Sequence, residues 1–273
     1  MRMKNKDAFD IHYPSVRQFT ADTGKLGKDK HDIRAFLEVD VSDALQGIKA
    51  LRAAGRKITF LAWFIKLLAD TVVRHPPING IKKGRNKVRV FNDVNIATVV
   101  EKMVDGVQVP LPLLLRDANQ KDVLQLDAEI RDAISQAVDN EMNLVLGKGE
   151  NRLLMQFSLA MPQWMRLWVM RTFILHNPRR MHNMMGTVMV SSLGTVGRLT
   201  GWIMPASMHP LSIGLGSLSK KAVIHQGKIQ KRSILHLTIA LDHDVIDGMP
   251  ALRFVDDLVA SLESGAGLDA DQA

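Results

Sequence analysis

Two kinds of apolar periodicity alternate along this chain, and their order limits the fold more than any other feature. Residues 35–41 alternate apolar and polar side chains, which predicts a strand with one buried face. Residues 42–54 then repeat apolar side chains at helical spacing behind Ser42, a favourable helix N-cap, and residues 59–75 repeat them again up to a Pro-Pro pair. Because strand and helix patterns mix to the end of the chain, we predict one α/β domain.

The later patterns predict a mixed β-sheet covered by helices. Predicted strands occupy residues 88–91, 94–100, 107–115, 186–191, 211–219, 222–225, 228–230 and 234–241. Predicted helices occupy residues 121–140 and the segment that begins at Pro250, since proline suits the first helical position. We therefore expect an N-terminal extension at 1–32, the domain at 33–265 and a disordered tail at 266–273.

Composition excludes several classes of function. The chain has no cysteine, which rules out disulfides, thiolate nucleophiles and Cys-ligated metals, and its nine histidines lack metal-ligand spacing, so we expect no metal site. The net charge of +8 is spread along the chain with one tyrosine, so we expect no nucleic acid partner, whereas a phosphate-rich ligand suits the charge. Residues 1–10 are charged and carry no apolar run, which predicts a cytoplasmic protein without a secretory signal.

The last predicted strand leads into a segment that could carry chemistry. It reads LDHDVIDG at residues 241–248, with His243 at the strand exit and Asp247 just beyond it. An imidazole can take a proton from a thiol or hydroxyl near neutral pH, and a nearby carboxylate can orient such a base. His-Asp pairs are common in proteins, however, and most histidines are surface or satisfied core residues. Spacing alone leaves both interpretations open.

Read together with its surroundings, this segment resembles the catalytic domain of 2-oxo-acid dehydrogenase E2 acyltransferases, of the chloramphenicol acetyltransferase superfamily. The other matching blocks, in order along the chain, are residues 94–100, 106–110, 116–118, 189–194, 210–216 and 227–229. The resemblance covers about residues 33–263. It implies a chloramphenicol acetyltransferase-like two-layer fold, and a homotrimer whose active sites lie in channels between subunits.

The resemblance also implies a role for individual residues. His243 matches the general base, Ser191 matches the hydroxyl that donates a hydrogen bond to the tetrahedral oxyanion, and Asp247 matches an acidic or amide position near the base. Ser192 is a neighbouring rival for Ser191, and Gly248 would allow the tight turn. The implied reaction is direct acyl transfer between coenzyme A, or acyl-CoA, and a hydroxyl, thiol or amine, on a small molecule or a carrier.

Two departures from the family pattern favour a stand-alone member. Only about thirty residues precede the first predicted strand, with no lipoyl-lysine segment, so we expect no covalently bound lipoyl group in this chain. Asp244 stands where E2 enzymes usually place an arginine after the histidine. The alternatives are an E2-type transacylase core that uses lipoyl groups from a separate protein, and a non-catalytic oligomeric scaffold of the same fold.

Residues 150–182 form an atypical helical segment, rich in Met, Trp and Arg, with no good counterpart in E2 enzymes. Its apolar side chains suggest three interpretations: extra packing over the core or the trimer seam, a lid over a pocket for a bulky acyl chain, or contact with a membrane surface through residues 153–175. Pro162, two glutamines and two arginines make the apolar stretch a poor membrane-spanning helix.

Overall fold

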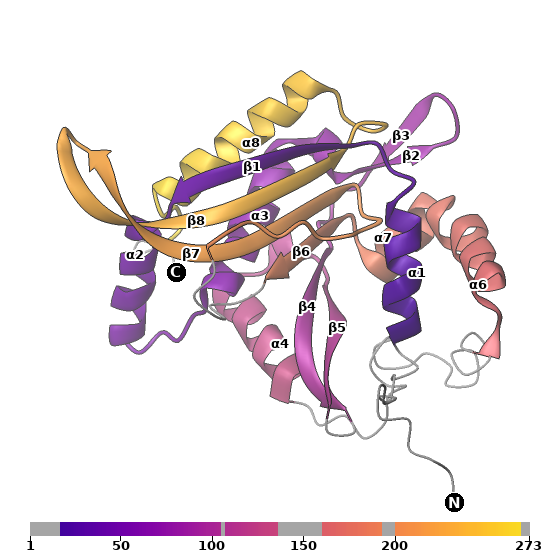
Figure 1. The fold of residues 1–273 in the computed structure, drawn as a ribbon, viewed down its shortest axis with the longest axis horizontal. Coiled ribbons are helices and arrows are strands. Elements are labelled where there is room, and N and C mark those ends of the chain that lie inside the picture. The colour runs from indigo at the N-terminus through magenta and orange to yellow at the C-terminus, as the bar shows by residue number, and fades with distance from the viewer. Residues whose placement is uncertain (1–16, 105–106, 136–159, 193–199, 269–273) are drawn as a thin grey trace, which may run out of the picture.

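A computed structural model of the chain describes residues 17–104, 107–135, 160–192 and 200–268 (Figure 1). Six strands form one mixed sheet in the order β1-β8-β7-β6-β4-β5, in which β6 runs parallel to both β4 and β7 and the other neighbours are antiparallel. The strands are β1 (Asp32–Asp40), β4 (Ile96–Val104), β5 (Val107–Leu115), β6 (Val188–Ser192), β7 (Leu211–His225) and β8 (Lys228–Asp242). A separate hairpin consists of β2 (Gly80–Lys83) and β3 (Lys87–Val90).

Four helices cover one face of the sheet: α2 (Ser42–Ala53), α3 (Phe60–Arg74), α4 (Val123–Ser135) and α8 (Gly248–Glu263) (Figure 1). The core lies between these helices and alternate side chains of the strands, with α3 at its centre. Thr59 caps α3 by accepting a hydrogen bond from the Ala62 amide at 3.2 Å. The predicted α/β domain, with a mixed sheet covered by helices, is confirmed. Of the predicted helix 121–140, residues 136–140 lie outside the described part.

The C-terminal strands are longer than their sequence pattern suggests. The segments 211–219 and 222–225 form the single strand β7, and 228–230 and 234–241 form the single strand β8. Polar residues interrupt the alternation because the two strands pair as a long hairpin that extends beyond the core. A register shift between Leu215 and Leu218 marks a β-bulge, which also breaks the period-two pattern.

The other face of the sheet is partly covered by the irregular segment 200–210. The backbone of this segment passes so close to β7 that a Cβ on Gly214 would lie 2.5 Å from the Ile203 carbonyl oxygen, and one on Gly216 would lie 2.5 Å from the Gly201 oxygen. These two glycines therefore permit the backbone of segment 200–210 to pack closely on the backbone of β7.

Two terminal segments differ from the prediction. Helix α1 (Arg17–Gly27) lies within the N-terminal extension, where the sequence showed no helix, and residues 1–16 lie outside the described part. At the other end, the predicted disordered tail begins too early. Leu268 is buried, and the Trp63 indole N–H donates to the Ala266 carbonyl at 2.9 Å, so residues 266–268 pack on the core.

The atypical segment is helical where the structure describes it. Helix α6 (Gln163–Val169) starts directly after Pro162, continues as a π-helix, η4 (Met170–Leu175), and is followed by α7 (Pro178–Met185). Short 3₁₀ turns occur at η1 (Pro76–Asn79) and η2 (Ala118–Gln120). None of the helices in the described ranges combines the length and the apolar character needed to cross a bilayer.

Candidate active site

His243 lies in the turn that connects β8 to α8, and its backbone is fixed on two sides. The His243 amide donates to the His31 carbonyl at 2.8 Å, just ahead of β1, and the Asp242 amide donates to the Pro210 carbonyl at 2.9 Å, just ahead of β7. The turn closes with the Val245 amide donating to the Asp242 carbonyl at 3.0 Å. The His243 side chain is exposed in the single protomer.

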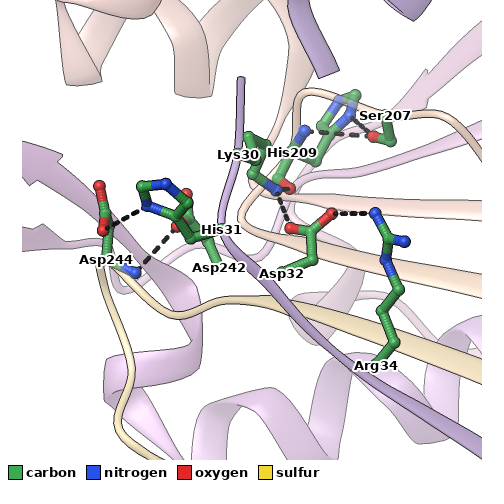
Figure 2. A network of polar contacts seen from close by, with 8 residues as sticks. All are labelled: Lys30, His31, Asp32, Arg34, Ser207, His209, Asp242 and Asp244. Carbon is green, nitrogen blue, oxygen red and sulfur yellow. Dashed lines mark hydrogen bonds and ion pairs between the residues drawn. The ribbon is translucent and has the colours of Figure 1, made fainter. Parts of the chain in front are cut away.

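Asp242 and Asp244, on either side of His243, both stabilise this turn (Figure 2). The Asp242 carboxylate accepts the Asp244 amide at 3.0 Å, while the Asp244 carboxylate lies 3.3 Å from His31 Nδ1 and 3.2 Å from Lys82 Nζ. Burial raises the pKa of Asp242 above its usual value. The hydrogen bonds from His31 and Lys82 lower the pKa of Asp244, so it stays ionised between two basic side chains.

A second group of polar contacts lies behind the turn. Lys30 forms an ion pair with Asp32 at 3.1 Å and donates to the His209 carbonyl (Figure 2). The His209 ring is buried, with Nδ1 2.7 Å from the Ser207 hydroxyl and Nε2 3.0 Å from the Met185 carbonyl. Burial lowers the pKa of His209 to about 4, so its ring is neutral at physiological pH. These contacts tie the entry of β1 to the segment just ahead of β7, next to the His243 turn.

Asp247 occupies the N-cap position of α8 without capping it. Its backbone is extended, and its side chain makes no capping hydrogen bond. The Asp247 side chain is exposed in the protomer and thus available for a contact outside the helix. Gly248 does not need to be glycine within the protomer, because its φ is not positive and an added Cβ would meet no atom within 4 Å. The backbone of the protomer therefore does not depend on the glycine that was expected to allow a tight turn there.

Ser191 lies near the end of β6, on the sheet face that points away from the helices. Val190, the preceding residue, belongs to the core on the helix-covered face, so the Ser191 side chain points to the opposite face. Ser192 pairs with the core residue Leu215 and therefore lies on the helix-covered face. The two candidate oxyanion donors, Ser191 and Ser192, thus point to opposite faces of the sheet.

One protomer does not bring Ser191 and His243 together. Ser191 pairs with Gly214 on β7, and Gly214 pairs with Thr238 on β8. His243 follows Thr238 by five residues, which corresponds to about 17 Å along the strand, and two strand spacings add about 10 Å across the sheet. A hydroxyl and a base at this separation cannot act on one carbonyl within the same subunit.

No sequence pattern indicated which residues surround His243. His31 and Asp244 are 213 positions apart, and Lys82 comes from a separate hairpin. No motif links these positions, since only the tertiary fold places them together. Within the described ranges, no group of three or more His, Cys, Asp or Glu side chains is arranged to hold a metal ion.

A family model described as 2-oxoacid dehydrogenases acyltransferase (catalytic domain) matches residues 26–149 and 176–268 of the chain. The match leaves out residues 150–175, which make up most of the atypical segment 150–182. Curated relatives include the dihydrolipoyllysine-residue acetyltransferase component of pyruvate dehydrogenase complex from Mycoplasma pneumoniae, 26% identical over 78% of this chain and 44% of the relative. The Staphylococcus aureus component is 23% identical over 77% of this chain and 41% of its own. The chain thus spans less than half of these relatives.

Solved structures share the fold. The cubic core of the pyruvate dehydrogenase multienzyme complex matches with a TM-score of 0.68 at 19% identity, covering 97% of this chain and 95% of that one. Azotobacter vinelandii dihydrolipoamide acetyltransferase matches with a TM-score of 0.65 at 21% identity, covering 97% of this chain and 96% of the other. The architecture predicted from the sequence blocks is therefore that of E2 catalytic cores.

Proposed function

Since the chain belongs to the 2-oxoacid dehydrogenases acyltransferase (catalytic domain) family, we propose that it transfers an acyl group between coenzyme A and a hydroxyl, thiol or amine acceptor. The active site lies between subunits of a homotrimer, with His243 from one protomer and Ser191 from its neighbour. We assign the catalytic domain to residues 33–268, because residues 266–268 pack on its core, and we propose that this domain carries no covalently bound lipoyl group and acts in the cytoplasm.

The chemistry follows from the two side chains. The His243 imidazole takes the proton of the attacking S–H, O–H or N–H group as that group bonds to the thioester carbonyl carbon. The carbonyl electron pair moves onto oxygen, and the Ser191 hydroxyl donates a hydrogen bond to this oxyanion, a charge that exists only in the transition state and intermediate. When the carbonyl re-forms, the C–S bond breaks and the leaving thiolate takes the proton from the imidazolium. The acyl group passes directly, without an acyl-enzyme.

The observation that carries the proposal is the separation of His243 and Ser191 within one chain. The His243 side chain is exposed in the turn after β8 and Ser191 is partly exposed near the end of β6, yet the two lie too far apart to share a substrate. An arrangement between subunits supplies the missing partner at each site. The fold match to the cubic core of the pyruvate dehydrogenase multienzyme complex supports such a site.

Residue spacing supports the assignment of Ser191 over Ser192. The Azotobacter vinelandii structure is described as an investigation of a serine, a histidine and an asparagine in the catalytic mechanism. In that chain the serine precedes the histidine by 52 positions and the asparagine follows it by 4. Ser191 and Asp247 stand at the same spacings from His243.

The runner-up is an E2-type transacylase that uses lipoyl groups from a separate protein, which the names of the curated relatives favour. Asp244 separates the two functions on structural grounds. Its carboxylate is held by His31 and Lys82, so an acidic side chain engaged in the turn follows His243 where E2 enzymes usually have an arginine. We therefore favour an acceptor other than a lipoyl group. A scaffold would require neither His243 nor Ser191.

A thiol-release assay tests the proposal. The purified protein is given a panel of acyl-CoAs with alcohol, amine and dihydrolipoamide acceptors, and free coenzyme A is measured. We expect turnover that His243→Ala reduces about 10²–10⁴-fold and Ser191→Ala about 10²–10³-fold.

The Ser192→Ala variant is the matched control, because Ser192 is the adjacent hydroxyl on the core side of β6. We expect its turnover to stay within about threefold of the parent, since it is not placed to donate to the oxyanion. Turnover that survives both His243→Ala and Ser191→Ala would refute the mechanism. Absence of turnover and of binding with every acyl-CoA and acyl-lipoamide would favour the scaffold, and reaction with dihydrolipoamide alone would favour the runner-up.

A further inference from the structure

A cavity of about 460 Å³ lies between the β2–β3 hairpin and the start of α7. It is lined by Lys83, Arg89, His176, Asn177, Pro178 and Arg179. Lys83 and Arg89 lie on the face of the hairpin opposite Lys82, because side chains alternate along a strand, and Lys82 is the residue that binds Asp244. The cavity is therefore separate from the His243 turn.

Positive charge around this cavity is not balanced locally. The hairpin segment 80–91 and the segment 160–192 together contain nine Lys and Arg residues and no Asp or Glu. Three of the nine are paired with carboxylates from elsewhere in the chain: Lys82 with Asp244, Arg166 with Asp22, and Arg171 with Asp29. The three cations that line the cavity form no ion pair with any carboxylate in the described ranges. Such a site favours a phosphate group.

A second feature adjoins the cavity. Trp164, Trp168 and Phe173 are 70%, 57% and 46% exposed, and the Trp168 and Phe173 rings meet edge to face at 5.9 Å. Trp164 and Trp168 are four residues apart on one face of α6. Arg166, on the opposite face of the same helix, is 7% exposed and anchors the helix through Asp22. The aromatic face is thus held outward by a buried ion pair.

The aromatic face and the cavity are adjacent along the chain and lie at the same end of the molecule. The π-helix that contains Phe173 leads directly into His176 at the cavity, and Arg180 donates to the Phe173 carbonyl at 3.3 Å. Helices α6 and α7 and the β2–β3 hairpin lie at the same end of the molecule, opposite the tip of the β7–β8 hairpin (Figure 1). Aromatic side chains and free cations therefore form one surface.

We propose that this surface docks the protein onto an anionic lipid bilayer, with a lipid phosphate in the cavity and the aromatic rings in the interfacial layer. Tryptophan is favoured at the membrane interface, and clustered Lys and Arg bind anionic headgroups. The aromatic residues fall in 150–175, which the family model leaves out. The proposal does not depend on the acyl-transfer chemistry.

Charge favours a bilayer over a second copy of the chain that docks face to face through the same surface. Each copy carries a net charge of +8 and presents the same cations around its cavity, so two such surfaces facing each other would repel. The acidic side chains that could compensate, Asp22 and Asp29, are already paired with Arg166 and Arg171. A lipid surface supplies both the negative charge and the apolar layer.

Vesicle sedimentation tests the proposal. The full chain is mixed with vesicles of phosphatidylcholine, or of three parts phosphatidylcholine and one part phosphatidylglycerol, and the pelleted fraction is measured against lipid concentration. We expect binding to the anionic vesicles alone. Each of two double variants, Lys83→Glu with Arg89→Glu and Trp164→Ser with Trp168→Ser, should weaken partitioning about tenfold or more.

Lys228→Glu with Lys231→Glu is the matched control, because it makes the same charge change at the opposite end of the molecule. It should weaken binding less than about threefold. Circular dichroism and thermal unfolding establish that each variant is folded. The proposal is overturned if the parent does not bind, if the control loses as much as the cavity variant, or if the tryptophan variant keeps full binding. A lower oligomer mass in the tryptophan variant, with vesicle binding unchanged, would assign the aromatic face to contacts between copies.

Discussion

Arg166 Nε donates to the fully buried carboxylate of Asp22 at 2.7 Å, which joins α6 to α1 across 144 positions of sequence. The other carboxylate oxygen accepts from the Gln163 side chain at 2.9 Å, and Arg166 also donates to the Met161 carbonyl at 2.8 Å. The pair is thus hydrogen-bonded on several sides. It is the main polar attachment that the structure describes between the N-terminal helix and the segment carrying the exposed aromatic residues.

Removing one charge of this pair should loosen both helices. In the Asp22→Asn variant, Arg166 remains buried without a counter-charge, a change that typically costs about 3–5 kcal/mol. We expect a loss of roughly that size in the free energy of opening of α1 and α6, measured by hydrogen exchange of their amides.

The exposed pair between Asp29 and Arg171 supplies the comparison, since it joins the same two parts of the chain. Asp29→Asn should cost less than about 1 kcal/mol, because solvent screens the charges. Equal effects of the two substitutions on amide exchange would contradict a special role for the buried pair.

His209 should make the fold sensitive to acid. Burial holds its pKa at about 4 in the folded protein, below the value of 6.5 expected when unfolded, so the unfolded chain binds more protons between these values. Stability from this group is complete above pH 6.5 and falls as the pH drops toward 4, by about 3 kcal/mol in total. In His209→Gln, denaturant unfolding at a series of pH values should show a shallower slope in this window. An unchanged slope would rule out His209 as its source.

If each active site is shared between two subunits, two inactive variants that lack different groups should restore activity when they form mixed trimers. We expect Ser191→Ala and His243→Ala proteins to be nearly inactive alone, because every site lacks one group. When the two chains are co-expressed and form mixed trimers, some interfaces combine an intact serine with an intact histidine. Coenzyme A release by the co-purified mixture should then recover to a sizeable fraction of the parent rate. Mixing without subunit exchange is the control, and no recovery in verified mixed trimers would place both groups in one subunit.

Asp247 should affect turnover more than stability. Because its side chain makes no capping bond to α8, Asp247→Ala should lower the free energy of unfolding by less than about 1 kcal/mol, leaving only the loss of a negative charge near the helix N-terminus. Turnover should fall about tenfold or more if Asp247 positions the groups around His243.

Thr59→Ala is the comparison for stability, since Thr59 does cap a helix and also bonds to Asp127 at 2.7 Å. It should cost about 1–2 kcal/mol with turnover per folded molecule unchanged. The reverse ranking, with Asp247→Ala destabilising and turnover intact, would make Asp247 a structural residue only.

The sequence by itself determined the elements of the sheet layer and the position of the histidine at a strand exit. These follow from apolar periods of two and 3.6 residues, which depend on neighbours a few positions away. Long strands such as β8 were found only in pieces, because the part of the hairpin beyond the core has no buried face to impose the period. Helix α1 was missed for a similar reason, since its buried residues are only Asp22 and Leu26 and do not form an apolar stripe.

Only the tertiary structure decided how distant residues combine. It paired Asp22 with Arg166, placed His31 and Lys82 on either side of Asp244, and separated Ser191 from His243 within one protomer. It also turned Trp164 and Trp168 outward rather than into the core. The physical reason is that burial and charge pairing are set by whole-chain packing, where partners more than a hundred residues apart meet, and local periodicity carries no information about such partners.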